Sequence, residues 1–409
     1  MRTTRTRSEW RWVILAAVAC LPAVALRFSE AGVEPALASL VYGVAIVGAA
    51  FLLSWAAEAA QVDIPSALAI AILAIITILP EYSVEAVLAW KAGNAFAVNP
   101  GAPEIGYVAA NVTGANRLLI GLGWPVVVLA FWLRRRHPLV AVHGLPLEMT
   151  VLLVATLLTL LVLVTRSVPL WLAAVLIGVY LWYLWSSSRG KSAEDLEIAG
   201  PAALIGGLSP LRRRSMVLSL FVYSAAVIVV AAEPFVEGLI HTGLKLGVDE
   251  FMLIQWLAPL ASEAPEMIVA TLYALRINPV IGIRALISAS VNQMTVLIGS
   301  MPVVFSLALG QAHSFPLGSR QLEEFLLTAS LSLFAIVLFA RMRLTPWHAL
   351  GLLAFFFAHL FFPDEGQRLV ASYVLLGLTA ITLARDPGRA KALFSMARSV
   401  LRRVPSGQV

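Results

Sequence analysis

Long apolar runs recur along the whole chain, and they limit its fold more than any other feature. Many windows of about twenty residues contain almost no charge, which is the length that a helix needs to cross a hydrocarbon core of about 30 Å. Of the 409 residues, 60% are hydrophobic and only 13% are charged, whereas a soluble domain has about 25% charged residues. We therefore predict an all-α integral membrane protein whose surroundings are the lipid bilayer.

Twelve candidate spans can be placed on the sequence. Their approximate limits are 12–27, 36–58, 64–90, 106–133, 148–165, 168–186, 216–238, 250–274, 280–308, 322–340, 346–362 and 368–385. If the N-terminus is cytoplasmic, the segments on that side hold 21 of the 29 Lys and Arg residues, and the opposite segments hold six. This excess follows the positive-inside rule and predicts a multi-pass protein of the cell membrane with both termini in the cytoplasm.

Other features of the composition exclude several classes of protein. The Arg-rich start, followed by Pro-Ala-Val-Ala at 22–25, is also typical of a cleaved signal peptide, although we favour a retained helix. The basic residues lie in short loops, so no nucleic-acid partner is expected. The single cysteine, Cys20, excludes a disulfide framework and a Cys-based zinc site. The six His residues are scattered, which disfavours an intramembrane enzyme.

An internal repeat is visible in the apolar spans. A Pro-Glu pair occurs within the segment ILPEYSVE (78–85) and again within LASEAPEM (260–267). The span that follows each pair has an Asn seven residues before a Gly, at Asn116 and Asn292. Spans 2–6 and 7–11 are therefore predicted to be two copies of a five-helix unit, with one extra helix at each end of the chain.

An odd number of spans in each copy places the second copy upside down relative to the first. Inverted repeats with interrupted helices are the architecture of secondary transporters, with the ion site near the midplane. The predicted divisions are 1–32 for an N-terminal cytoplasmic segment and extra helix, 33–187 for the first repeat, 188–215 for a cytoplasmic linker, 216–362 for the second repeat, and 363–409 for the last helix and a basic cytoplasmic tail.

The chemistry of the Pro-Glu pairs indicates cation binding. A charge near the bilayer centre is costly and usually has a function, and a proline frees the carbonyl four residues before it. Carboxylate and carbonyl oxygens are the ligands that Ca²⁺ prefers. We predict a metal site at Glu81 and Glu266, with the hydroxyls of Thr77 and Ser262 one turn earlier. Ca²⁺, two Na⁺ or two H⁺ would each neutralise the two carboxylates, which favours exchange, and no cofactor is expected.

Two further acids share helix faces with these glutamates. Glu263 lies three residues before Glu266, and Glu85 lies four residues after Glu81. Crowded carboxylates titrate together, and at least one of them has a raised pKa. We therefore predict that Glu263 and Glu85 carry protons or tune the site, with an ordinary solvated acid as the alternative for each.

Polar residues in the spans after each Pro-Glu pair are further candidates. Asn116 and Asn292 are predicted to be ion ligands, with hydrogen bonding between helices as the alternative. Gln293 is a weaker candidate for lining the site. Arg117 lies near the middle of a span, and we expect it either to neutralise a third carboxylate, such as one of the two additional acids, or to extend to the membrane surface.

These motifs resemble those of the calcium/cation antiporter superfamily, which includes sodium/calcium and proton/calcium exchangers. Sodium/calcium exchangers carry Gly-Thr-Ser-x-Pro-Glu twice, and the segments here read ITILPE (76–81) and ASEAPE (261–266). The resemblance covers about residues 36–362. It implies that the two central carboxylates are Glu81 and Glu266, and that the family's Thr ligand corresponds to Thr77 and, as Ser, to Ser262.

The departures from the family pattern bear on the coupling ion. The family's serine falls on Ile78 and Glu263, which removes hydroxyl ligands for sodium, while the segment SVNQMT (290–295) is similar to one in proton/calcium exchangers. The sequence therefore predicts a secondary-active antiporter that exchanges Ca²⁺ for H⁺ or Na⁺ by alternating access, with a tilt towards H⁺. The alternatives are exchange of Na⁺ or another monovalent cation for H⁺, and a non-transporting sensor or channel with the same fold.

Overall fold

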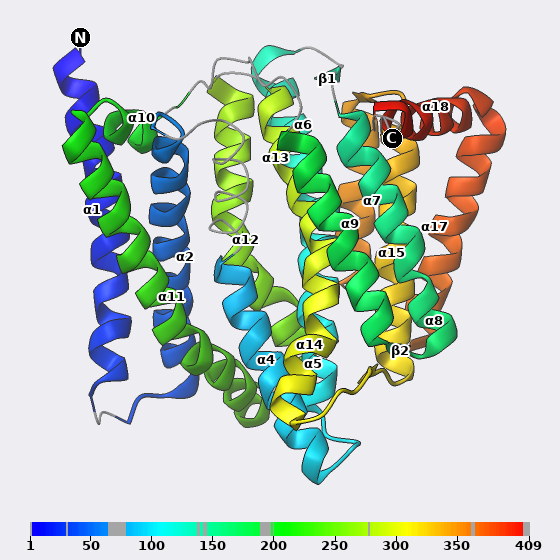
Figure 1. The fold of residues 1–409 in the computed structure, drawn as a ribbon, viewed down its shortest axis with the longest axis horizontal. Helices are drawn as coiled ribbons and strands as arrows, with labels where there is room; N and C mark the ends of the chain where they lie inside the picture. The colour runs from blue at the N-terminus through cyan, green and yellow to red at the C-terminus, as the bar shows by residue number, and fades with distance from the viewer. Residues whose placement is uncertain are drawn as a thin grey trace, which may run out of the picture. The chain divides into compact units, whose positions relative to one another are not determined.

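The computed structural model describes residues 2–29, 32–63, 79–136, 140–141, 145–188, 198, 200–276, 279–360 and 365–403, and nearly all of them are helical (Figure 1). The elements are α1 (Arg2–Arg27), α2 (Pro35–Ala60), α4 (Leu79–Val98), α5 (Glu104–Leu118), the π-helical turn η1 (Leu119–Gly123), α6 (Trp124–Arg135), β1 (Val140–Ala141), α7 (Pro146–Thr159), α8 (Leu161–Thr165), β2 (Ser167–Val168), α9 (Leu170–Ser188), α10 (Gly200–Gly206), α11 (Pro210–Leu246), α12 (Glu250–Arg276), α13 (Pro279–Asn292), the π-helical turn η2 (Gln293–Leu297), α14 (Ile298–Leu309), β3 (Phe315–Pro316), α15 (Ser319–Phe339), β4 (Arg343–Leu344), α16 (Pro346–His359), α17 (Glu365–Arg385) and α18 (Pro387–Arg403).

The helices agree with the predicted membrane class. Within the described residues, nine helical segments are long and apolar enough to cross a bilayer, and each lies at a predicted span. The predicted eighth and eleventh spans are the helices α12 and α16. The predicted third span includes residues 64–78, which lie outside the described residues. The all-α membrane fold is therefore confirmed, whereas the number of twelve spans stays a prediction.

The described chain forms two compact units. The first contains Met1–Leu88 and Leu184–Pro265, and the second contains Ala89–Tyr183 and Glu266–Val409. Each unit takes helices from both predicted repeats, so the boundaries in space do not follow the division of the sequence into halves.

In the first unit, α2 packs against α1, α10 and α11. Two glycines permit the close approach of these helices. A Cβ atom added at Gly48 of α2 would lie 2.8 Å from the carbonyl oxygen of Ala16 in α1, and one added at Gly238 of α11 would lie 2.3 Å from the hydroxyl of Ser39 in α2. Small residues are what apolar helices use to pack in lipid, where no hydrophobic driving force joins them.

An ion pair joins the end of α2 to the start of α11. Two nitrogens of Arg213 donate to the two carboxylate oxygens of Asp63, both at 2.7 Å. The Arg213 guanidinium lowers the pKa of Asp63 to about 2. This pKa is lower than that of an unfolded Asp, which is about 3.9. The ion pair therefore contributes its full stabilisation of the fold when the pH is above about 3.9. The stabilisation is lost as the pH falls towards 2.

We expect Asp63→Asn to lower the melting temperature of the detergent-solubilised protein at pH 7. The difference from the wild type should narrow as the pH falls from about 4 to about 2, because the wild-type carboxyl is then protonated as well. Thermal unfolding followed at several pH values measures this difference. A difference of the same size at both ends of the range would contradict the expectation.

In the second unit, two short antiparallel ribbons join loops from different halves of the chain. β1 pairs with β4 and β2 pairs with β3, and the two ribbons lie at opposite ends of the unit (Figure 1). β1 and β3 follow the helices that continue from the π-helical turns, and β2 and β4 each follow the next span. β1 and β3 therefore occupy equivalent positions in the two halves of the chain, as do β2 and β4. Each ribbon pairs a strand that follows a π-turn helix in one half with a strand that follows the next span in the other half.

The core of the second unit lies along α5 and α15. Every residue of α5 from Ile105 to Leu118 is buried, and α5 packs against α15 and η2. The buried residues include Asn111, Thr113, Asn116 and Arg117, so polar and charged groups lie within the apolar interior of this unit. Buried groups of this kind need hydrogen-bonding or ionic partners.

Candidate ion-binding site

The second Pro-Glu pair lies within one continuous helix, α12. Because Pro265 has no N–H group, the carbonyl of Ala261 loses its helical hydrogen bond and is available to a ligand. The hydroxyl of Ser262 donates to two carbonyl oxygens of the preceding turn, both at 3.3 Å, which leaves its lone pairs free to bind a cation. Glu263 is buried, at 3% exposure, while Glu266 is partly exposed.

The first Pro-Glu pair lies at the start of α4. Glu81 and Glu85 are both buried, at 6% and 1% exposure, and their spacing places them on one helix face. A buried carboxylate is unstable without a positive partner or a proton. Thr77, the predicted hydroxyl ligand of this motif, lies outside the described residues, and its role stays a prediction.

Asn116 takes part in a hydrogen bond between helices. Its side-chain oxygen accepts from the hydroxyl of Ser332 in α15 at 3.0 Å. This bond is the alternative to ion ligation that the sequence left open. An amide oxygen has two lone pairs, so one of them remains for a ligand. Asn292, at the matching position of the other repeat, is also buried.

Gln293 is the clearest mark of a polar site in the second unit. It is the first residue of the π-helical turn η2 and is only 1% exposed. Neither its amide oxygen nor its amide nitrogen has a hydrogen-bond partner within the described part of the chain. Burying such a group unpaired costs about 1–3 kcal/mol, and π-helical turns occur frequently at functional sites. Gln293 therefore stays a predicted residue of the site.

Arg117 has a partner that the sequence did not indicate. Its Nη2 atom lies 2.5 Å from Oε2 of Glu324 in α15, and its Nε donates to the carbonyl oxygen of Thr113 at 3.2 Å. The side chain is 1% exposed, so it does not extend to the membrane surface. The structure thus pairs Arg117 with the carboxylate of Glu324, which the sequence analysis did not name.

A four-residue charge cluster, consisting of Arg117, Glu323, Glu324 and Arg368, joins three helices of the second unit. Nε of Arg368 in α17 lies 3.5 Å from Glu324 and 3.7 Å from Glu323. Two positive and two negative charges balance in this buried position. Sequence analysis missed the cluster because Glu323, Glu324 and Arg368 lie at the starts of predicted spans, where charges are ordinarily solvated. The sequence signal that could have indicated the cluster is the adjacent pair Glu323 and Glu324 in an apolar span.

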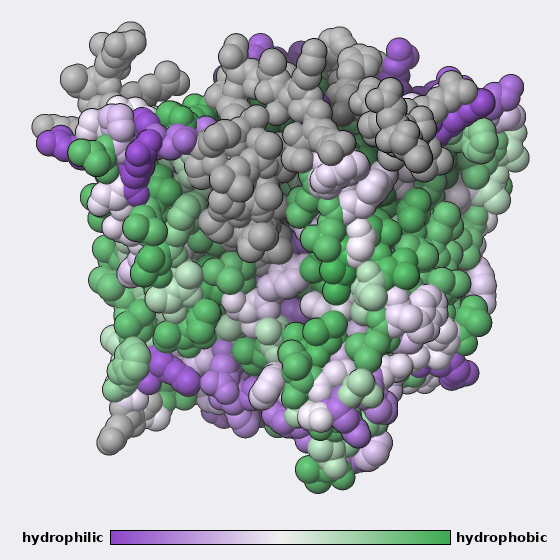
Figure 2. Space-filling model, viewed as in Figure 1, coloured by the Kyte–Doolittle hydropathy of each residue, from purple (hydrophilic) through white to green (hydrophobic). Residues whose placement is uncertain are grey.

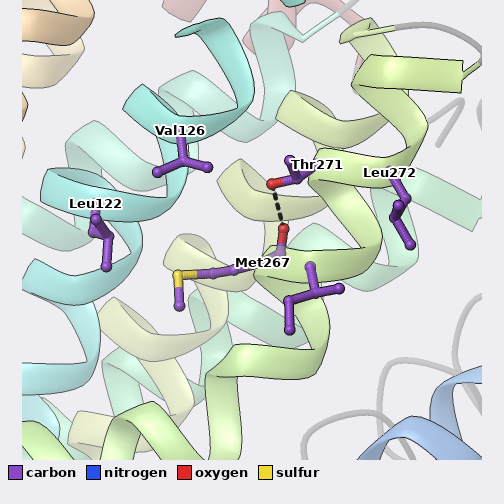
Figure 3. A pocket seen from close by; sticks show the side chains of 6 residues that line it. Leu122, Val126, Met267, Thr271 and Leu272 are labelled. Atoms are coloured by element: carbon purple, nitrogen blue, oxygen red, sulfur yellow. Dashed lines mark hydrogen bonds between the residues drawn. The ribbon is translucent and has the colours of Figure 1, made fainter. Parts of the chain in front are cut away.

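A cavity beside the C-terminal half of α12 does not fit a cation. It has a volume of about 310 Å³ and is lined by Leu122, Val126, Met267, Ile268, Thr271 and Leu272 (Figure 3). The one polar side chain, that of Thr271, donates its hydroxyl hydrogen to the carbonyl of Met267 at 2.7 Å. Within the described ranges, no group of three or more His, Cys, Asp or Glu side chains could hold a metal. The candidate ligands therefore remain the glutamates of the Pro-Glu pairs.

The fold and the buried acids of the proline-bearing helices define a multi-pass membrane protein of the transporter class. Residues 35–189 and 216–363 match the family model described as sodium/calcium exchanger protein, and the chain belongs to this family. The matched segments nearly coincide with the predicted repeats. The resemblance to the calcium/cation antiporter superfamily is thereby confirmed.

Solved structures extend this comparison. The chain is similar to the H⁺/Ca²⁺ exchanger CAX, with a TM-score of 0.90 and 34% identity over 97% of this chain and 98% of that one. YfkE matches with a TM-score of 0.58 and 13% identity over 90% and 99% of the two chains. The sodium-calcium exchanger NCX_Mj matches with a TM-score of 0.52 and 16% identity over 81% and 97%. The last two show a common fold. No curated protein sequence matches this chain.

Proposed function

We propose that this protein is a secondary-active antiporter that exchanges Ca²⁺ for H⁺ or Na⁺ across the cell membrane. The observation that carries the proposal is the nearly full-length match, at 34% identity, to an H⁺/Ca²⁺ exchanger. Between the two coupling ions we favour H⁺, because Ile78 and Glu263 replace the serine hydroxyls that sodium/calcium exchangers carry beside their Pro-Glu pairs.

Glu81 and Glu266 are the proposed ligands of the transported cation. The oxygens proposed to complete the coordination come from Thr77, Ser262, Asn116 and Asn292. Ca²⁺ takes six to eight oxygen ligands in flexible arrangements, which carboxylates, hydroxyls and amide oxygens together can supply. Protons that replace the cation would occupy the same carboxylates, since an empty pair in a low-dielectric interior is unstable.

Glu85, Glu263 and Gln293 have a supporting role in this proposal. Glu85 and Glu263 are both buried, and we propose that they carry protons or tune the site. The unpaired amide of Gln293 favours a position beside the ion or its path. Arg117, which is neutralised by Glu324, acts on the site as a positioning residue, since it follows Asn116 directly in α5.

The proposed membrane arrangement has twelve spans, two inverted repeats and cytoplasmic termini. The two ribbons of the second unit support the repeats, because β1 and β3 have equivalent positions in the two halves of the chain, and each pairs with the strand after the next span in the other half. The distribution of Lys and Arg supports the orientation. Alternating access would come from movement of the first two spans of each repeat, and the first spans of both, α2 and α11, pack against each other within the first unit.

Reconstitution into proteoliposomes tests the proposed exchange. We expect Ca²⁺ uptake when the lumen is more acidic than the bath, because outward H⁺ flow would then drive inward Ca²⁺ flow. A protonophore should abolish this uptake, and an outward Na⁺ gradient without a pH gradient should replace it only weakly. Ca²⁺ that equilibrates without counter-flux would indicate a channel. Na⁺/H⁺ exchange that Ca²⁺ does not compete with would indicate the monovalent exchanger.

A further inference from the structure

The last helix, α18, is fastened across one end of the second unit (Figure 1). It packs against α7, α15 and α17. The guanidinium of Arg389 donates to the carbonyl oxygens of Val337 and Leu338 at the end of α15, at 2.9 and 2.6 Å. Asp386, just before α18, forms ion pairs with Arg389 and with Arg341. These contacts give α18 a defined place on the unit.

One face of α18 combines positive charge with an exposed aromatic ring. Lys391, Phe394, Ser395 and Arg398 are exposed, whereas Val400 is buried. Spacings of three, four and seven residues place the exposed side chains on one side of the helix. Phe394 is 73% exposed. Neither Lys391 nor Arg398 forms an ion pair within the described residues.

The charge of α18 is of one sign. Its 17 residues contain Arg and Lys but no Asp or Glu. Basic helices with an apolar or aromatic component lie in the plane of the membrane surface, where the ring enters the boundary of headgroups and acyl chains. The preceding helix α17 exposes a row of apolar side chains, including Val370, Tyr373 and Val374, which suits contact with lipid. In Figure 2, hydrophilic residues lie at the upper right corner, where Figure 1 shows α17 meeting α18, and the surface beneath them is mostly hydrophobic.

We propose that α18 lies in the headgroup layer of the bilayer and binds anionic phospholipids. Lys391 and Arg398 contact the headgroups, and the ring of Phe394 inserts between them. Positive charges close to an anionic leaflet are attracted to it, and α18 is fastened to α15, so bound lipid would anchor the second unit to the membrane surface. The proposal rests on the bilayer location given above and is independent of which ions are exchanged.

A spin label tests this placement in the full-length protein. Cys20 is the single cysteine and is buried, so Cys20→Ala with Ser395→Cys places one nitroxide beside Phe394. The protein is incorporated into nanodiscs of phosphatidylcholine, with or without phosphatidylglycerol. The measured quantity is the ratio of the label's collision rates with oxygen, which concentrates in hydrocarbon, and with a water-soluble nickel complex. We expect this ratio to rise when phosphatidylglycerol is present.

The variant Lys391→Gln/Arg398→Gln should lose this rise. The matched control Arg134→Gln/Arg135→Gln removes two exposed charges from the end of α6 and should keep it. Adding inorganic phosphate to phosphatidylcholine nanodiscs should leave the ratio unchanged, since the ligand is a lipid headgroup. A ratio that is equal in both lipids, or a rise that persists in the Lys391/Arg398 variant, would overturn the proposal. Transport by that variant is expected to be unchanged, so failure here is distinct from failure of the antiport proposal.

Discussion

Replacing Glu266 by Gln is expected to abolish Ca²⁺ exchange while the protein still folds. The substitution keeps the size of the side chain and removes the charge that we propose to hold the cation. Removing a carboxylate ligand of a divalent cation is expected to lower the cation affinity about 100-fold or more, which corresponds to about 3 kcal/mol or more of binding free energy. Uptake of Ca²⁺ into proteoliposomes, driven by a pH gradient and measured over a range of Ca²⁺ concentrations, gives this loss directly.

The matched control is Glu250→Gln, the same substitution in the same helix. Glu250 is the first residue of α12, about 24 Å along the helix axis from Glu266 at 1.5 Å per residue. We expect this variant to transport at the wild-type rate. Undiminished exchange by Glu266→Gln would show that Glu266 is not a ligand of the transported cation. Equal losses in both variants, with normal folding, would show that α12 tolerates neither change and that the ion-ligand assignment lacks support.

Breaking the buried pair of Arg117 and Glu324 is expected to destabilise the second unit strongly. Arg117→Met leaves an excess negative charge in the cluster, and Glu324→Gln leaves an excess positive charge. Each should cost about 3–5 kcal/mol of stability, because an unpaired charge stays buried. The double variant Arg117→Met/Glu324→Gln leaves one positive and one negative charge, Arg368 and Glu323, and should recover most of the loss.

Thermal unfolding in detergent of the wild type, both single variants and the double variant measures this coupling. The control is Lys245→Met, which breaks the exposed pair with Glu34, at 3.1 Å. An exposed pair contributes at most about 1 kcal/mol, so little change is expected. If the single variants of the buried pair lost no more than this control, the cluster would not stabilise the fold. A double variant as unstable as the sum of the single variants would show that the two charges are not coupled.

Several parts of the fold and the candidate site could be read from local patterns. Apolar length predicted the spans, since the thickness of a bilayer sets how long an apolar helix must be. The duplicated Pro-Glu pairs predicted Glu81 and Glu266, because an acid beside a helix breaker in an apolar span is too costly to retain without a function. The repeat limits followed from comparing the chain with itself, and the family match falls on nearly the same residues.

The partners of the buried charges could not be read in this way. Arg117 pairs with Glu324, and Asn116 accepts a hydrogen bond from Ser332, in a helix some two hundred residues later in the chain. In a bilayer, a helix is apolar both where it faces lipid and where it faces another helix. The pattern of apolar residues along a helix therefore does not show which other helix it contacts. The same is true of the two compact units, which combine helices from both repeats.

The sequence by itself determined the membrane class and the repeated pattern, and it predicted the acids that we propose as ligands of the cation. Each of these follows from a property of a single segment, which is either its apolar length or the free-energy cost of placing a charge within it. The tertiary structure decided which helices pack together, and thereby which charges neutralise one another. Only packing brings Arg117, Glu324 and Arg368 within 4 Å of a partner, and the stability of a buried charge depends on exactly that distance to its opposite.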